Sequence, residues 1–292
     1  MHLQTTFQVS ERRACEVLDQ PRSTQRQQPK ERPEEKPLVK RMLELVGQHP
    51  RFGYRRIWAL LRREGWRVNR KRVYRLWRQQ GLKVPRRKKK RRRLGHSGNG
   101  CVRYRARAKD HVWAWDFIHD RTADGRPLKW LSVVDEFTRE CVALEVARSM
   151  TAARVVQILA GVIRERGGVG HIRSDNGPEF IAAEIRRWLA EAKVGTLYIE
   201  PGSPWENGYC ESFHSRLRDE LLEREEFSTP LEARVLSAAW KQQYNHERPH
   251  SALGYQTPAE FAKKCPRADS AILKRTEDAS VSVDPTLTAP GT

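Results

Sequence analysis

The order of apolar patterns between residues 111 and 222 limits the folds that are open to this chain. Three strand patterns follow one another directly, "HVWAWDFIH", "LKWLSVVDEF" and "CVALEVA", which predicts an antiparallel meander. From residue 151 on, helical patterns alternate with two short strand patterns, "GHIRS" and "TLYIE". Strands that are joined through helices commonly pair in parallel. The sequence therefore predicts an α/β fold with a mixed five-stranded sheet and helices on its faces.

The positive charge of the chain is concentrated in one segment. The formal net charge is +20, and residues 38–95 contain 22 of the 56 Lys and Arg residues but only two acids, Glu44 and Glu64. The rest of the chain has 34 residues of each sign and is neutral. The segment is therefore the candidate for binding a polyanion. A membrane surface is the less favoured partner, because no amphipathic anchor and no run of about 18 apolar residues accompanies the charge.

Residues 38 to 81, inside this basic segment, have the pattern of three short helices. Asn69 is a suitable N-cap for the third helix, "RKRVYRLWRQQ", and Gly81 is a suitable stop. A short helix, a turn and a basic-faced helix match the helix-turn-helix arrangement of DNA-binding domains. A merely solvated face would carry both signs of charge, and here acids are absent. The residues of this helix that we expect to contact DNA are Arg70, Lys71, Arg75 and Arg78.

A run of eight cations, "RRKKKRRR" at residues 86–93, follows the helices. Mutual repulsion keeps such a run extended. It can neutralise backbone phosphates without reading bases, and its affinity should fall steeply with salt. The alternative interpretation is a linker that only improves solubility. The residues of the run that we expect to contact DNA include Arg86, Arg87, Lys88, Lys89, Lys90 and Arg91.

The cysteine and histidine residues do not suggest a disulfide framework or a zinc site. The five cysteines are far apart and form no CxxC pair, which is typical of unpaired thiols in a reducing cytoplasm. The N-terminus has no apolar signal core. His246 and His250 are four residues apart, but Pro249 would interrupt a shared helical face, so we interpret both as structural.

Three acidic residues occupy chemically suggestive positions in the predicted fold. Asp116 lies within the first strand of the core, Asp175 at the end of the fourth, and Glu211 early in the helix after the fifth. The first and fourth strands can be neighbours, because the first strand is free to pair on its other side. Clustered carboxylates repel one another, and a bound divalent ion relieves that repulsion. An all-oxygen ligand set favours Mg²⁺ or Mn²⁺ over zinc.

The third acid has a rival, since Glu206 precedes Glu211 by five residues. Each acid taken alone is more typical of a turn or a solvated position than of a ligand. We prefer Glu211 because His214, Ser215 and Arg218 follow it at i+3, i+4 and i+7, as a polar stripe along one helical face. Arg218 could hold a phosphate near the metal.

Several motifs resemble a known family when they are taken in order. "WAWDF", "RSDNGPEF" and "SPWENGYCESFHSRLRDEL", with a separation of 35 residues between Asp175 and Glu211, resemble the DDE catalytic core of the retroviral-integrase superfamily. The resemblance is closest to the second-reading-frame transposases of IS3-family insertion sequences. "HPRFGYRRIWALLRREGWRVNRKRVYRLWRQQGL" resembles their helix-turn-helix, and "YNHERPHSALGYQTPAEF" their C-terminal signature. Two departures are "GYC" before Glu211, where a small residue is usual, and the absence of the zinc module of retroviral relatives.

This resemblance, which covers residues 9 to 262, implies an RNase H-like sheet with helices on both faces, preceded by a small helical DNA-binding domain. It implies that Asp116, Asp175 and Glu211 hold two Mg²⁺ or Mn²⁺ ions and that Arg218 is the basic residue seven positions further on. The implied reaction nicks the ends of an element and joins the freed 3′-OH to another strand. The implied partners are double-stranded DNA, further copies of the chain and a fused upstream reading-frame product, on the nucleoid in a bacterial cytoplasm.

Two other functions stay open at this point, a DNA-binding regulator with an inert core and a structure-specific nuclease on the same fold. The regulator would not need three intact acids, and the nuclease would not need a helix-turn-helix. We expect the start of the chain to be joined to upstream sequence in the active form. The predicted divisions are a partial helix and disordered linker at 1–36, the helix-turn-helix at 37–84, a basic linker at 85–108, the catalytic core at 109–225, a helical extension at 226–265 and a disordered tail at 266–292.

Overall fold

The computed structural model describes residues 2–27, 33–84, 104–174, 183–198 and 208–266. It divides into two compact units, residues 1–49 and residues 50–292. In the first unit, the Ser10 side chain caps the second helix by accepting a hydrogen bond from the Arg13 backbone N–H. The segment that we predicted as a linker contains a one-turn helix. The helices of this unit are α1 (His2–Phe7), α2 (Glu11–Val17), α3 (Arg22–Gln25) and α4 (Glu35–Gln48).

The second unit begins with two short helices, α5 (Tyr54–Arg63) and α6 (Arg70–Gln79). Asn69 caps α6 as predicted, because its Oδ1 accepts a hydrogen bond of 2.8 Å from the Arg72 N–H. The apolar side chains that α5 and α6 bury are Ile57, Ala59, Leu61, Val73, Leu76 and Trp77. Arg70, Lys71, Arg75 and Arg78 of α6 are exposed, which leaves a basic surface on this helix.

The sheet has the order β3-β2-β1-β4-β5. Its first three strands form an antiparallel meander, and β4 and β5 run parallel to β1. The predicted mixed sheet and the predicted pairing of the first and fourth strands are thus confirmed, and the fold is RNase H-like. The strands are β1 (Val112–Arg121), β2 (Pro127–Asp135), β3 (Cys141–Ala147), β4 (His171–Ser174) and β5 (Gly195–Tyr198).

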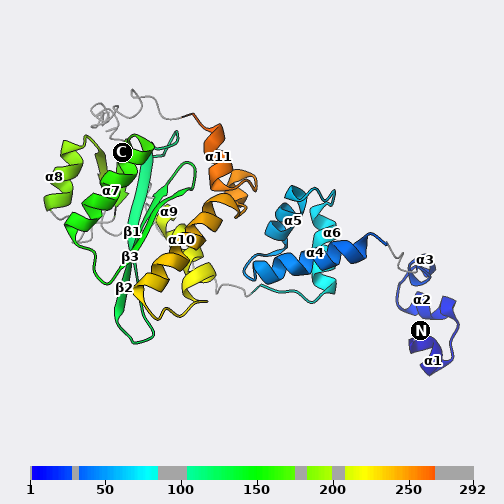
Figure 1. The fold of residues 1–292 in the computed structure, drawn as a ribbon. Coiled ribbons are helices and arrows are strands. Elements are labelled where there is room, and N and C mark those ends of the chain that lie inside the picture. The colour runs from blue at the N-terminus through cyan, green and yellow to red at the C-terminus, as the bar shows by residue number, and fades with distance from the viewer. Residues whose placement is uncertain (1, 28–32, 85–103, 175–182, 199–207, 267–292) are drawn as a thin grey trace, which may run out of the picture. The chain divides into compact units, whose positions relative to one another are not determined.

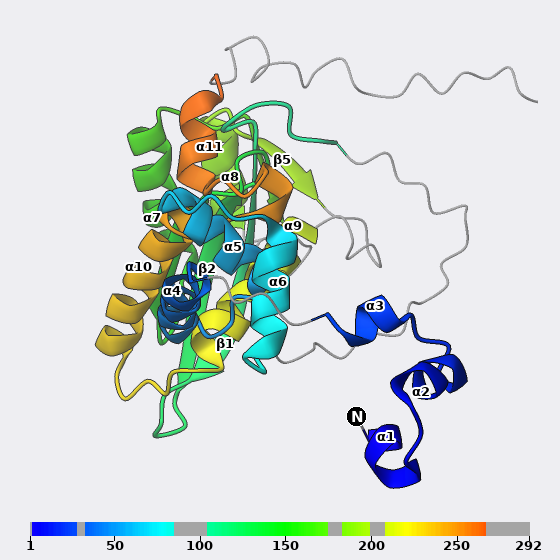
Figure 2. The same ribbon diagram turned by 90° about the vertical axis from the view of Figure 1, so that its right-hand side faces the viewer.

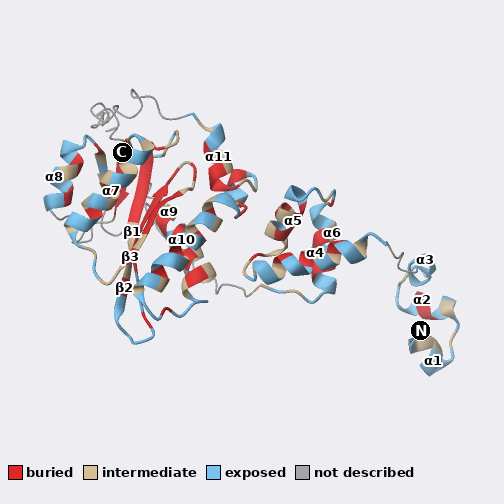
Figure 3. Cartoon of the chain, in the orientation of Figure 1, coloured by how far each residue is buried: buried red, intermediate tan, exposed pale blue. Residues whose placement is uncertain are grey.

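Helices cover both faces of the sheet, with α7 (Ala152–Arg166) and α8 (Ala183–Glu191) on one side and α9 (Gly208–Leu217) and α10 (Pro230–His246) on the other (Figure 1). Successive side chains of a strand point to opposite faces. Trp113 and Trp115 of β1 accordingly pack with α7 and α8, while Ile118 packs with α9 and α10. Figure 3 shows the strands as the most continuously buried part of the chain.

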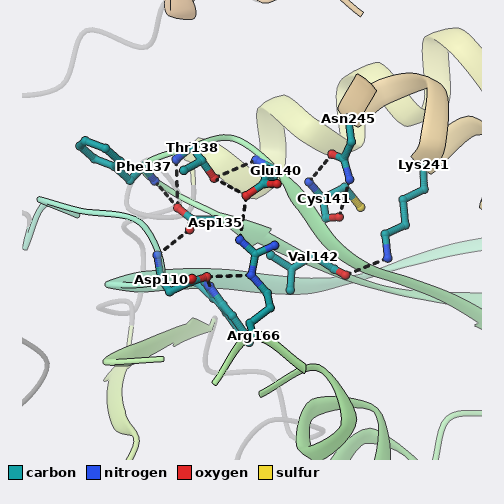
Figure 4. Close-up of polar contacts among 11 residues, drawn as sticks. Asp110, Asp135, Phe137, Thr138, Glu140, Cys141, Val142, Arg166, Lys241 and Asn245 are labelled. Atoms are coloured by element: carbon teal, nitrogen blue, oxygen red, sulfur yellow. Dashed lines mark hydrogen bonds and ion pairs between the residues drawn. The ribbon is translucent and has the colours of Figure 1, made fainter. Parts of the chain in front are cut away.

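The C-terminal helices pack closely against the meander. Asn245 of α10 accepts a hydrogen bond from the Cys141 N–H and donates one to the Cys141 carbonyl, and Lys241 donates to the Val142 carbonyl (Figure 4). The next helix, α11 (Pro258–Lys264), begins with a capping box formed by Thr257 and Glu260 and contacts α10 (Figure 2). None of the helices in the described residues combines the length and the hydrophobicity of a membrane-spanning segment.

A buried polar network fixes the start of β1 against the turn between β2 and β3 (Figure 4). Asp135 is fully buried and accepts backbone hydrogen bonds from Asp110, Phe137 and Thr138, at 2.8, 2.7 and 3.0 Å. Burial raises the pKa of Asp135 to about 6, although these N–H donors act in the opposite direction. The network therefore holds the ends of β1 and β2 in register.

Arg166, at the end of α7, joins the helix to this network. Its guanidinium donates to Asp110 at 2.8 Å and to Glu140 at 2.7 Å. The Asp110 side chain is 2% exposed and the Glu140 side chain 13% exposed. Removing a partner from a buried ion pair leaves the other charge without compensation, which is strongly destabilising.

We therefore expect Arg166→Met to lower the free energy of unfolding by about 3 kcal/mol, measured by urea denaturation. Arg164→Met on the same helix removes an exposed cation and should change stability by less than about 0.5 kcal/mol. Equal effects of the two substitutions would show that the network contributes nothing particular to stability.

Candidate active site

Asp116 lies on the face of β1 that α9 covers. It is in phase with Ile118, and its strand partner on β2 is Ser132. The Asp116 side chain is 23% exposed, and its Oδ1 accepts a hydrogen bond of 2.7 Å from the Phe117 N–H. The Ser132 hydroxyl donates to the Asp116 carbonyl at 3.1 Å. A central strand of the sheet thus holds this carboxylate rigidly while leaving it accessible.

His214 links α9 to this part of the sheet. Its Nε2 lies 2.7 Å from Ser132 Oγ, and its Nδ1 lies 3.6 Å from Asp116 Oδ2. Because Ser132 has one hydroxyl proton and donates it to the Asp116 carbonyl, Nε2–H is the donor to Ser132 Oγ. The lone pair on Nδ1 then faces a carboxylate oxygen. The two acceptor atoms repel each other, and a nearby cation would reduce that repulsion.

Glu211 precedes His214 by three residues, which places both on one face of α9. The Glu211 side chain is exposed, and α9 packs against β1 and β2. Arg218 begins η2 (Arg218–Leu222), a π-helical turn that continues α9. Arg218 is exposed, and its charge helps to lower the pKa of His214. The structure therefore brings Asp116 and His214 together, with Glu211 and Arg218 on the helix that carries His214.

The remaining acids of the prediction cannot be placed, since Asp175 and Glu206 lie outside the described residues. The strand that precedes Asp175 runs beside β1, because Ala114 is paired with Arg173. Among the residues that the structure describes, no group of three or more His, Cys, Asp or Glu side chains could hold a metal ion. The donors that are described at the site, carboxylate oxygens of Asp116 and Glu211, are of the type that Mg²⁺ and Mn²⁺ prefer.

Sequence reasoning missed Ser132 and the contacts of His214. Ser132 was recognisable as a polar residue inside the apolar run "KWLSVVD", but its partner is 82 residues away in the chain. The predicted DNA-contacting cations of α6 are Arg70, Lys71, Arg75 and Arg78, and all are exposed. The basic run that includes Arg86–Arg91 lies outside the described residues.

The environment of His214 generates a pH prediction. Burial, and then the charge of Arg218, lower the pKa of His214 to about 4. Between pH 6.5 and pH 4 the unfolded imidazole binds a proton that the folded one does not, so the free energy of unfolding falls as the pH is lowered. We expect His214→Gln, whose amide can still donate to Ser132, to remove about 2 kcal/mol of that loss between pH 7 and pH 5.

Urea denaturation at pH 7, 6 and 5 checks this expectation as a difference between the parent chain and the variant. His119→Gln replaces an exposed histidine on β1 and serves as the matched control. The prediction is wrong if His214→Gln and His119→Gln give the same pH profile.

The helical segment and the sheet each match a known protein family. Residues 33–90 match a family model described as an HTH-like domain. Residues 106–204 and 192–258 match two models that are both described as an integrase core domain. Together these matches span the basic helices, the sheet and the whole of α10.

Several curated proteins are similar over most of their length. An insertion element IS407 protein of 31.7 kDa from Burkholderia multivorans is 40% identical over 262 residues, which cover 88% of this chain and 91% of that protein. An insertion element IS476 protein of 39.2 kDa from Xanthomonas euvesicatoria is 39% identical, covering 87% and 72%. The transposase InsD of insertion element IS2 from Escherichia coli is 28% identical, covering 78% of each chain.

Solved structures with partial similarity include an HTLV-2 integrase catalytic core domain in complex with magnesium, at 17% identity and a TM-score of 0.43 over 54% of this chain and 99% of that chain. A simian T-cell lymphotropic virus intasome chain covers 78% of this chain and 78% of its own, at 14% identity and a TM-score of 0.48.

Proposed function

Because the chain belongs to the IS3 family of insertion-element DNA transposases, we propose that it nicks the ends of its element and joins the freed 3′-OH to another DNA strand. The observation that carries this proposal is the position of Asp116. A carboxylate on the central strand of an RNase H-like sheet faces the helix that presents Glu211 and Arg218. The fold supplies the rigidity that metal-dependent phosphoryl transfer requires.

DNA binding in this proposal begins with the basic segment. The exposed cations of α6 enter the major groove or contact its phosphates, and residues 86–93 neutralise the backbone further along. Contacts to phosphates position the protein on the duplex, whereas contacts to base edges select the sequence. The two parts together bring an element end to the sheet and its carboxylates. Joining two ends requires at least two copies on the DNA, and we propose a homo-oligomer in the bacterial cytoplasm, on the nucleoid.

We propose that Asp116, Asp175 and Glu211 hold two divalent metal ions, Mg²⁺ or Mn²⁺. When bound, such ions lower the pKa of the attacking water or 3′-hydroxyl and stabilise the departing 3′-oxygen. The protein's own residues orient the reaction. Ser132 holds the backbone of Asp116 and the ring of His214, the Phe117 N–H holds the Asp116 carboxylate, and Arg218 holds a phosphate oxygen close to the scissile bond.

The triad can be tested by substitutions that remove the charge and preserve the shape. Asp116→Asn, Asp175→Asn and Glu211→Gln should each lower strand cleavage by more than about 100-fold, because outer partners of metal ligands already cost 10–100-fold. Binding to an element-end duplex in EDTA should persist in all three variants. Cleavage is measured with Mg²⁺ on element-end DNA, random DNA and an RNA–DNA hybrid.

Glu206→Gln is the matched control for the third position. If it abolishes cleavage while Glu211→Gln stays active, Glu206 is the third ligand. Cleavage of all three substrates alike would instead indicate a nuclease. Binding without any cleavage by the parent chain would indicate a regulator.

The basic run generates a separate prediction about affinity. Replacing residues 86–93 by a Gly/Ser segment of equal length should weaken binding to all DNA sequences alike. It should also flatten the dependence of log Kd on log [KCl] by up to about 7, since each phosphate contact contributes about 0.9. Fluorescence anisotropy with element-end and random duplexes measures both quantities. A loss confined to the element-end sequence would refute a backbone-neutralising role.

A further inference from the structure

A cavity of about 430 Å³ lies beside the candidate active site, between α9, the turn after β2 and the segment that follows α10. Four arginines line it, and we call it the arginine cavity. None of its lining residues among those that the structure describes is acidic. The arginines are Arg56 from α5, Arg139 from the turn, Arg216 from α9 and Arg248 after α10.

The buried carboxylate of Glu220, behind the wall of the cavity, compensates part of this charge. The Glu220 side chain is 8% exposed and pairs with Arg248, whose side chain is 3% exposed, through contacts of 2.6 and 2.8 Å. Arg56 lies 3.5 Å from the same carboxylate. Arg248 also donates to Nε2 of His250 at 3.2 Å. Among the described residues, Glu220 thus faces Arg56 and Arg248 directly, and the charge of Asp219 attracts both guanidinium groups more weakly.

The charge of the arginines shifts the pKa values of groups in the cavity. The pKa of Arg56 is lowered to about 10, by burial first and by the charge of Arg248 second. Burial and the four arginines of the cavity lower the pKa of His250 to about 2. The guanidinium groups around the cavity therefore repel one another, and an anion bound in the cavity would reduce that repulsion.

The backbone at Arg139 supplies an independent observation. Its φ of 66° lies in the left-handed region, which costs energy for a residue other than glycine. The Arg139 guanidinium lies 3.7 Å from the centre of the Tyr209 ring, in the first turn of α9. The first residues of a helix also offer backbone N–H groups and the positive end of the helix dipole to an anion. Gly208 and Tyr209 of α9 line the cavity.

We propose that the arginine cavity binds a backbone phosphate of the DNA strand that the active site holds, an inference that rests on the proposed function. Planar guanidinium groups with several N–H donors are the side chains best matched to phosphate oxygens. Ser212 of the cavity directly follows Glu211, so the two side chains diverge by roughly 100° around α9. One helix thus separates the reacting phosphate from an anchoring phosphate, a distance that a few nucleotides of a strand span.

The substitution that tests the arginine cavity is the double variant Arg139→Gln/Arg216→Gln, made in the full chain carrying Asp116→Asn. A 40-base-pair duplex ending in the terminal repeat of the element is the probe, with EDTA present so that metal binding plays no part. The slope of log Kd against log [KCl] should flatten by about 0.9, and affinity at 0.1 M KCl should fall roughly eightfold. The control is Arg186→Gln/Arg187→Gln on α8, which removes two exposed cations from the other face of the sheet.

A second variant distinguishes weaker DNA binding from a loss of folding. Ser212→Asp places a carboxylate in the cavity, where it can pair with the arginines, so its thermal midpoint should not fall. Its affinity for the duplex should drop by as much as that of the double variant. If Ser212→Asp is folded and binds DNA as tightly as the parent, or if the double variant matches its α8 control, the arginine cavity does not bind DNA phosphate.

Two further outcomes separate this inference from others. If the variants lose self-association in light scattering but keep their affinity per protomer, the occupant is an acidic group of a second copy, which overturns the proposal. If the parent chain itself binds no duplex, both the proposed function and this inference fail. If the parent binds and cuts element ends while the cavity variants behave as controls, only the inference fails.

Discussion

The pairing of β1 on both of its sides is the constraint on which the rest of the molecule depends. This strand pairs antiparallel with β2 over nearly its whole length and parallel with β4 at its start, Val112–Ala114. A slip of its register by one residue would turn every side chain to the opposite face. Trp113 and Trp115 anchor one face, and Asp116 comes next on the other. A carboxylate can be partly exposed here without being mobile because its strand is locked by the residues on either side.

Buried ion pairs connect segments that are far apart in the sequence. Arg166 ties α7 to the start of β1, and Arg173 of β4 pairs with Glu136 at 2.8 Å. Arg248 and Glu220 tie the residues after α10 to the π-helical turn η2. A buried ion pair contributes little net stability over an apolar contact, but a mismatched partner is costly. These pairs therefore determine which arrangement of the segments forms more than they add to its stability. The arginine cavity brings four guanidinium groups together at one of these junctions.

The sequence predicts what depends on local periodicity and on strand order. The meander, the alternation of helices with β4 and β5, and the cap at Asn69 follow from patterns within a few residues. The neighbouring position of β1 and β4 follows from topology, because the meander leaves one side of its first strand open. Contacts such as Ser132 with His214, or Arg139 with Tyr209, join residues far apart in the chain and have no local signal. The positions of Asp175 and Glu206 remain predictions, since both lie outside the described residues.

The bonds from α10 to β3 have a consequence for how copies of this protein can assemble. Asn245 occupies the donor and acceptor of Cys141 much as a neighbouring strand would, and Lys241 occupies the carbonyl of Val142. The start of β3, on the outer border of the meander, is thereby covered against strand addition. A strand that added to this part of β3 would therefore have to displace the side chains of Asn245 and Lys241.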